Sequence, residues 1–336
     1  MLAWLMSPEI LAILIGLGKA LVIFLVAMLS MAWGTWLERR MLGLWQDRYG
    51  PNRVGPFGLG QVLADMFKAL FKEDWMPPFA DKFTFILAPF LSLSMMLLGF
   101  VFIPLTPTWG IANPNVAVLL FLALGGLAVY AVMLAGWSSG NKYSLLGGVR
   151  STAQTISYEV FMGLSLMGIV MQAGSFNLRD IVAWQGEHGP FLFWQFPAFC
   201  IWVLSALAVI HRAPFDLPEA ESELVQGYHT EYASMKFAMF MLSEYLGMVM
   251  VAALTTAMFF SGWHGPFWTE QVPFLWFGLK TFLFVCAYIL VRASLPRPRY
   301  DQLMSLAWKV ILPISLINLL VTAALVLWNT PGMTGN

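Results

Sequence analysis

Two carboxylates lie inside apolar segments long enough to cross a membrane, and their placement suits proton chemistry. Glu159 lies about seven residues into an apolar run near 152–173, and Glu244 about seven into a run near 237–260. A charged side chain at mid-bilayer costs about 3 kcal/mol on insertion scales, so neither is expected to favour stability. Both predicted helices enter from the same membrane face, so the two carboxyls can share one buried polar seam at similar depth. We therefore predict a proton relay; the alternative is a structural ion pair, for instance with Lys280.

The connection near 212–236 carries the second group of acids. It reads HRAPFDLPEAESELVQGYHTEY, and its carboxylates are Asp216, Glu219, Glu221, Glu223 and Glu231. Prolines stiffen this segment, and interleaved apolar residues give it surface for packing. Clustered carboxylates repel one another, so some are expected to hold protons near neutral pH. The pattern predicts an acidic funnel that feeds the two intramembrane glutamates; a solvated acidic loop is the alternative.

The connection near 34–82 contains a short amphipathic segment at residues 58–72. Its apolar residues recur at helical spacing and are Leu59, Leu63, Met66, Phe67 and Leu70. The segment is too short and too charged to span a membrane, so we expect a helix at the membrane surface or against a partner. Glycines and prolines between residues 50 and 60 fix an irregular backbone beside it, which favours a docking platform over a flexible linker.

The elements that position these residues are membrane-spanning helices. The chain has 336 residues, of which 59% are hydrophobic and 11% charged, far below the charged share of about a quarter in soluble domains. Apolar runs of spanning length lie near 10–33, 83–105, 115–137, 152–173, 194–211, 237–260, 272–293 and 306–329. We predict an all-α integral membrane protein with about eight transmembrane helices and one amphipathic surface helix, folded as a single domain over residues 1–336.

The distribution of positive charge predicts the orientation. With residues at span ends assigned to the nearer loop, 15 of the 18 lysines and arginines fall in four connections, near 34–82, 138–151, 212–236 and 294–305. The positive-inside rule places these connections in the cytoplasm, and both termini are then expected on the outer, periplasmic side.

Several kinds of bound group leave no signature in the sequence. The two cysteines, Cys200 and Cys286, lie in separate apolar runs without a second ligand at metal-binding spacing, so no metal site is predicted. A glycine-rich dinucleotide loop and a P-loop are also missing from the sequence. Any redox cofactor or nucleotide is therefore expected to be held by another protein, and no nucleic-acid partner is predicted.

Four long segments resemble a known family over nearly the whole chain. They read GLGQVLADMFKALFKE, GWSSGNKYSLLGGVRSTAQTISYEV, PFDLPEAESELVQGYHTEY and RASLPRPRYDQLM. In this order they are similar to the signature regions of one membrane subunit of respiratory NADH:quinone oxidoreductase (complex I), the bacterial counterpart of mitochondrial NADH dehydrogenase subunit 1.

This resemblance implies a place where the membrane arm meets the peripheral arm, and a chamber through which ubiquinone enters from the bilayer. The entrance would lie between the first span, the 58–72 helix and the sixth span. The residues that would line or support the chamber are Glu38, Arg39, Arg48, Asp65, Lys68, Arg292, Arg299 and Asp301. The path that would link the chamber to the proton-pumping arm comprises Glu159, Asp216, Glu219, Glu221, Glu223, Glu231 and Glu244.

The resemblance also implies partners and a location. Ubiquinone would be the substrate, while flavin and the iron–sulfur clusters would belong to partner subunits. The partners would be the peripheral quinone-pocket and terminal iron–sulfur subunits, neighbouring small membrane subunits and lipid. The chain would be a multi-pass protein of a bacterial inner membrane, a subunit of a proton-translocating enzyme with no redox centre of its own.

Two other classes of function share part of the pattern. A related subunit of a membrane-bound hydrogenase would dock a similar peripheral arm but handle no quinone. A stand-alone ion antiporter would contain an internal repeat with paired broken helices, and the sequence has no such repeat.

Overall fold

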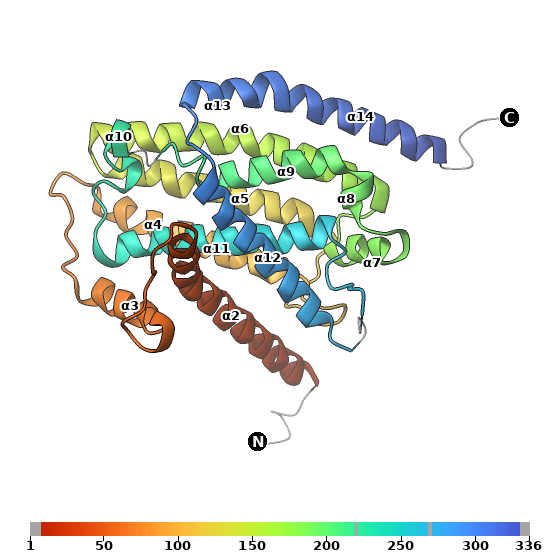
Figure 1. The fold of residues 1–336 in the computed structure, drawn as a ribbon, viewed down its shortest axis with the longest axis horizontal. Coiled ribbons are helices and arrows are strands. Elements are labelled where there is room, and N and C mark those ends of the chain that lie inside the picture. The colour runs from red at the N-terminus through yellow and green to blue at the C-terminus, as the bar shows by residue number, and fades with distance from the viewer. Residues whose placement is uncertain (1–7, 219–220, 268–270, 330–336) are drawn as a thin grey trace.

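The computed structural model describes residues 8–218, 221–267 and 271–329, and the regular elements of these ranges are helical (Figure 1). In chain order the elements are α2 (Pro8–Trp45), η1 (Pro56–Gly58), α3 (Gln61–Phe71), α4 (Lys82–Gly99), η2 (Phe100–Phe102), α5 (Ala117–Ser138), α6 (Lys142–Ala173), α7 (Leu178–His188), α8 (Phe191–Trp194), α9 (Phe196–Val209), α10 (Glu221–Leu224), η3 (Gly227–His229), α11 (Ser234–Phe259), α12 (Pro273–Ser294), α13 (Tyr300–Leu306), η4 (Ala307–Ile311) and α14 (Leu312–Asn329).

Within the described ranges, seven helices are long and apolar enough to cross a membrane. They are Ile13–Trp45, Lys82–Phe102, Ala117–Ser138, Lys142–Ala173, Ser234–Phe259, Pro273–Ser294 and Tyr300–Trp328. These seven correspond to seven of the eight predicted apolar runs, so the chain is a multi-pass membrane protein. The remaining run, 194–211, corresponds to the end of α8 and to α9, which has only 14 residues.

The short helix α9 lies inside the bundle, where it packs against α6 and α14. Trp202 at its centre is fully buried, and the indole Nε1 donates to Thr255 Oγ1 of α11 at 2.8 Å. The hydroxyl of Tyr288 in α12 lies 3.2 Å from the same Thr255 oxygen. Three helices are thus joined by one chain of polar atoms, which satisfies groups that would otherwise be costly to bury in an apolar core.

Two helices start or end well outside the predicted apolar runs. α2 continues past the predicted end at 33 through Glu38 to Trp45, and α6 begins at Lys142 rather than near 152. Hydropathy misses both extensions because they carry polar residues whose partners come from distant parts of the chain. For example, Arg150 Nη1 of α6 donates to Glu223 Oε2 at 2.6 Å, and Ser151 Oγ lies 2.7 Å from His211 Nε2. Glu159 consequently lies near the middle of α6.

Small residues bring α5 and α6 unusually close together. A Cβ atom built on Gly136 would lie 3.1 Å from the Gly148 Cα and 2.7 Å from the Ser144 carbonyl oxygen. Glycine at this crossing therefore permits backbone contact between the two helices, as is common in membrane bundles.

α2 and α12 cross the rest of the bundle at a slant, and both pack against α11 (Figure 1). In Figure 1 the helices α4, α5, α6, α9 and α11 run roughly across the view, whereas α2 and α12 descend diagonally in front of α11. Since α2 and α12 also contact each other, these two helices and α11 enclose a space on one side of the molecule.

Lys280 of α12 fastens the end of α11 to the connection that follows it. Its Nζ donates to the backbone oxygens of Phe260 at 2.6 Å, Gly262 at 3.1 Å and His264 at 2.5 Å. An ammonium group has three hydrogens, so these bonds use all of its donors and leave none for an intramembrane carboxylate. Burial, together with the Lys280 charge, lowers the pKa of the nearby His264.

Lys280→Met should destabilise the protein, because three carbonyl oxygens lose their donor. An unsatisfied buried polar group costs about 1–3 kcal/mol, so we expect a clear fall in the midpoint of heat-induced aggregation in detergent. Lys309 is exposed, and Lys309→Met serves as the control with an unchanged midpoint. Equal midpoints for both variants would contradict the fastening role of Lys280.

Candidate functional site

Glu38 is the most buried carboxylate among the candidate residues, with a side chain 3% exposed. Arg212 Nη1, from the turn after α9, donates to Glu38 Oε2 at 3.1 Å, and Arg292 of α12 pairs with Glu38 Oε1. Three distant chain segments therefore meet at one carboxylate. We call Glu38, Arg212 and Arg292 the ion cluster.

Arg212 also links this cluster to Glu244. Its Nε lies 4.0 Å from Glu244 Oε2, and its guanidinium carbon lies 4.0 Å from the Tyr245 ring centre. Arg212 is 8% exposed, so its charge is shared between two carboxylates that lie on α2 and α11. Sequence reasoning missed a site role for Arg212, although this residue directly precedes the proline-containing acidic segment.

The carboxyl of Glu159 faces a pair of glycines on α5. A Cβ atom built on Gly125 would lie 2.9 Å from Glu159 Oε1, and one on Gly126 would lie 3.7 Å from Oε2. Glu159 Oε1 is buried and has no hydrogen-bond partner among the described residues. The glycine pair thus makes room for a carboxyl group that α6 would otherwise press against α5.

A small cavity of about 50 Å³, lined by both polar and apolar residues, lies close to both intramembrane glutamates. Gly125, which faces Glu159, and Glu244 both line it. Its polar lining also includes Ser92 and Ser243, whose hydroxyl oxygens are 2.7 Å apart. The predicted seam between Glu159 and Glu244 therefore has a physical candidate, which we call the polar cavity.

Three acids of the 212–236 connection form ion pairs or hydrogen bonds with residues from elsewhere in the chain. The ion pairs and hydrogen bonds are Arg297 Nη2 to Asp216 Oδ2 at 2.8 Å, Arg150 Nη1 to Glu223 Oε2 at 2.6 Å and Asn141 Nδ2 to Glu231 Oε1 at 2.7 Å. Mutual repulsion among these acids is therefore weaker than the sequence suggested. Glu219 and the Glu221 side chain lie outside the described residues.

Tyr232 follows these acids and is buried against Phe85, with ring centres 4.1 Å apart. Burial raises the pKa of the Tyr232 hydroxyl, and a hydrogen bond with Ser138 opposes this shift. The hydroxyl therefore stays protonated at neutral pH.

The residues expected to line a chamber do not all lie together. Glu38 and Arg292 belong to the ion cluster. The others are exposed or half-buried near the predicted inner face: Arg39 pairs with Asp65 at 2.6 Å, Arg299 with Asp301 at 3.3 Å, and Arg48 and Lys68 are exposed. The Arg39–Asp65 pair joins α2 to α3, so it acts on the position of the amphipathic helix rather than on a buried site.

α3 occupies the predicted amphipathic segment and is attached at both ends. Trp36 Nε1 of α2 donates to the Phe57 carbonyl at 3.1 Å, just before α3. Ser234 Oγ of α11 lies 2.8 Å from the Ala69 carbonyl oxygen and 2.9 Å from that of Lys72 at the other end. Its apolar face, which comprises Leu63, Met66, Phe67 and Leu70, remains exposed.

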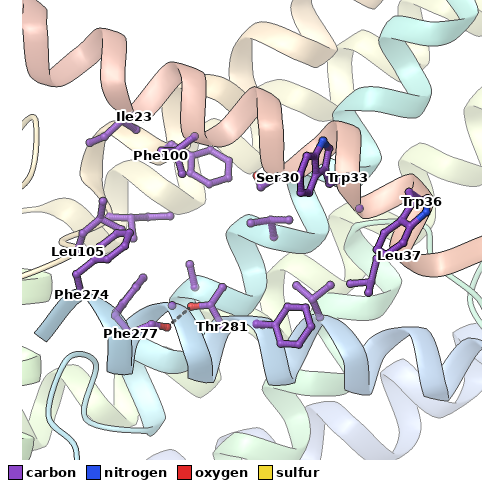
Figure 2. A pocket seen from close by; sticks show the side chains of 18 residues that line it. Ile23, Ser30, Trp33, Trp36, Leu37, Phe100, Leu105, Phe274, Phe277 and Thr281 are labelled. Carbon is purple, nitrogen blue, oxygen red and sulfur yellow. Dashed lines mark hydrogen bonds between the residues drawn. The ribbon is translucent and has the colours of Figure 1, made fainter. Parts of the chain in front are cut away.

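A large apolar cavity of about 370 Å³ lies between α2, α11 and α12 (Figure 2). Figure 2 shows Ile23 and Leu37 of α2 on one side and Phe274 and Phe277 of α12 on the other. The third wall is formed by α11 together with Phe100 and the segment after it. None of the residues that line this cavity belongs to the 58–72 helix. The expected entrance between the first span, that helix and the sixth span stays a prediction.

The apolar cavity ends next to the ion cluster. Leu37 lines it and directly precedes Glu38, and Val249 of α11 lines it and directly follows Met248. Met248, Glu38, Arg212 and Arg292 line a second, very small cavity of about 10 Å³. A molecule that enters between the helices would therefore meet apolar surface first and buried charge at the inner end.

Within the described ranges, no group of three or more His, Cys, Asp or Glu residues is arranged to hold a metal ion. Cys200 is exposed and Cys286 is half-buried.

The fold and the site define a multi-pass helical membrane protein with an apolar lateral cavity and buried ion pairs. The family model described as NADH dehydrogenase matches residues 18–323, and the chain belongs to this family. It is thus a membrane subunit of NADH:quinone oxidoreductase (complex I), of the type that the four signature segments predicted.

Glu38→Gln should destabilise the subunit strongly, because Arg212 and Arg292 lose their shared counter-charge. Breaking a buried ion pair by removing one partner costs about 3–5 kcal/mol. The measurement is the amount of subunit assembled in membranes and the rate of thermal inactivation of the complex.

The matched control is Asp65→Asn, which breaks an exposed ion pair with Arg39. Exposed pairs contribute less than about 1 kcal/mol, so this variant should assemble normally. The role of the ion cluster is refuted if the two variants are equally stable.

Proposed function

We propose that this subunit forms the chamber through which ubiquinone reaches the peripheral arm, and that it couples quinone reduction to proton pumping. The observation that carries the proposal is the apolar cavity of about 370 Å³ that ends beside the ion cluster. An apolar lining suits an isoprenoid tail, and a few charged groups at one end suit the orientation of a polar headgroup.

The electron-transfer chemistry belongs to partners in this proposal. Flavin and iron–sulfur clusters lie in other subunits, and the peripheral arm docks on the inner, cytoplasmic face of a bacterial inner membrane. The exposed apolar face of α3 and the exposed Arg299–Asp301 pair lie in connections that the positive-inside rule assigns to that face. Both termini then face the periplasm.

Arg212 supplies a direct electrostatic link from the chamber to the proton path. Two unit charges 4 Å apart interact by about 4 kcal/mol at an effective dielectric constant of ~20, so a change of charge at Glu38 acts strongly on Arg212. When Glu38 loses its negative charge, Arg212 interacts more strongly with Glu244 and favours its ionised form. The reverse change favours uptake of a proton by Glu244.

The proton path continues from Glu244 through the polar cavity to Glu159. The acids from Asp216 to Glu231, with Glu219, Glu221 and Glu223 between them, connect this path to the chamber and to the pumping arm. Their pairing with Arg297, Arg150 and Asn141 supports a path that works by rearrangement of ion pairs as well as by proton transfer.

A side chain introduced at Gly278 should obstruct the chamber without disturbing the fold. Gly278 lines the apolar cavity, and a Cβ atom there would meet no atom within 4 Å. Gly278→Leu should therefore raise the KM for quinone several-fold while the rate of NADH oxidation by ferricyanide stays unchanged.

Gly18→Leu is the matched control, since Gly18 is also open on α2 but does not line the cavity. Its KM for quinone should equal that of the wild type. If Gly278→Leu also leaves the KM unchanged, the cavity is not the route of the quinone.

Glu159→Gln and Glu244→Gln should each impair quinone turnover coupled to proton pumping, because an amide cannot carry the proton. Loss of an essential acid–base group typically costs about 10²–10⁴-fold, and a parallel route through other acids would reduce this effect. Pumping is measured in vesicles that contain the assembled complex, with NADH:ferricyanide activity as the control for the peripheral arm. Wild-type pumping by both variants would refute the relay.

A further inference from the structure

His211 is a buried ionisable residue that the proposed proton path does not yet use. It lies in the turn after α9, is 9% exposed and has a φ of 52°. Its Nε2 atom lies 2.7 Å from Ser151 Oγ and 2.9 Å from Thr155 Oγ1, both on α6. The ring is therefore held in one position against α6.

The hydrogen bonds around the ring suit a neutral tautomer with its hydrogen on Nε2. Thr155 Oγ1 donates its only hydrogen to the Ser151 carbonyl oxygen at 3.0 Å, so it can only accept from His211. In that tautomer, Nδ1 is the atom that takes up a second proton when the neutral ring becomes imidazolium. Histidine can make this change between about pH 5 and 8 without a large perturbation.

His211 lines the same cavity as Glu244 and as Gly125, the glycine that faces Glu159. Ser151, Thr155 and Glu159 are four residues apart on α6 and so share one face of that helix. His211 and Thr155 both line the polar cavity, together with Glu244 from α11. A polar cavity of about 50 Å³ has room for a few water molecules that can carry protons between these groups.

The charged and titratable groups around the polar cavity make proton uptake by His211 depend on the glutamates. Glu244 from α11 and Tyr228 from η3 line the cavity, and Glu159 from α6 faces the lining residue Gly125. Arg212 is the next residue in the chain after His211. The Arg212 charge opposes an imidazolium beside it, whereas an ionised carboxylate favours one. His211 thus holds a second proton mainly while Glu244 or Glu159 is ionised.

We propose that His211 is a proton-carrying residue between Glu244 and Glu159, an inference that rests on the proposed proton path. The O–H bond of the Glu244 carboxyl breaks as the imidazole gains a proton and becomes imidazolium. An N–H bond then breaks as the Glu159 carboxylate is protonated, and the ring returns to neutral. The same steps run in reverse when the path is driven the other way, and no other reactant is required.

The test is His211→Gln in the assembled complex. The glutamine amide can donate to Thr155 and Ser151 as Nε2 does, but it takes up no proton. We expect coupled quinone turnover and proton pumping to fall about tenfold, and the pH profile to lose an ionisation that falls between about pH 5 and 8. NADH:ferricyanide activity should stay at the wild-type rate.

His229→Gln is the matched control. His229 is also buried in the 212–236 connection, but it packs against the rings of Tyr228 and Phe240 and does not line the polar cavity. Its pH profile should match that of the wild type. If both variants lose the same ionisation, the effect is not specific to His211 and the proposal fails.

Two further results separate the outcomes. Thr155→Val leaves His211 ionisable but removes a contact that holds the ring. This variant should therefore lower turnover while the pH profile retains the ionisation. It also tests the proposal if His211→Gln assembles poorly.

Wild-type pumping and an unchanged pH profile in His211→Gln would overturn the proposal. If the Glu159 and Glu244 variants lose pumping in the same assay, the proposed relay stands and only the role of His211 is refuted.

Discussion

The arrangement of this subunit depends on the buried charge of Arg212. A guanidinium removed from water must be balanced by nearby negative charge, and here Glu38 and Glu244 provide it from two different helices. Arg292 adds a second positive charge on the other side of Glu38. Because two carboxylates and two guanidiniums are formally neutral together, α2, α11, α12 and the turn after α9 are held in one relative position. Displacement of any one of them would unbalance these buried charges.

The ion cluster also divides the molecule into an apolar part and a polar part. On one side lies the apolar cavity between α2, α11 and α12, whose lining can accept a lipid-soluble molecule but offers little to a proton. On the other side lies the polar cavity with Glu244, Thr155 and His211. Arg212 contacts Glu38 on one side and Glu244 on the other. A change of charge at one carboxylate therefore alters the electrostatic energy of the other, although no covalent bond joins the two parts. This arrangement fits a subunit whose task is coupling.

Apolar periodicity predicted most of the helical segments because long apolar runs in lipid have only one way to satisfy their backbone groups. It underestimated the length of a helix where polar side chains continue that helix beyond the apolar run. The continuation of α2 through Glu38 and the early start of α6 carry polar side chains whose partners, such as Arg212, Glu223 and His211, are far away in sequence. Hydropathy also could not separate α9, a helix of only 14 residues with one exposed face, from a helix long enough to span the membrane.

The order of the residues alone was enough to establish that the chain crosses a membrane several times, that it belongs to the NADH dehydrogenase family, and that Glu159 and Glu244 lie within spanning helices. Which charges neutralise one another followed only from the folded chain: Glu38 with Arg212 and Arg292, Glu223 with Arg150, and Asp216 with Arg297. The fold likewise opens a cavity between α2, α11 and α12 and turns His211 toward α6. The physical reason is that hydropathy and helical spacing act over one or two turns, whereas ion pairs and cavities depend on how helices distant in the chain cross.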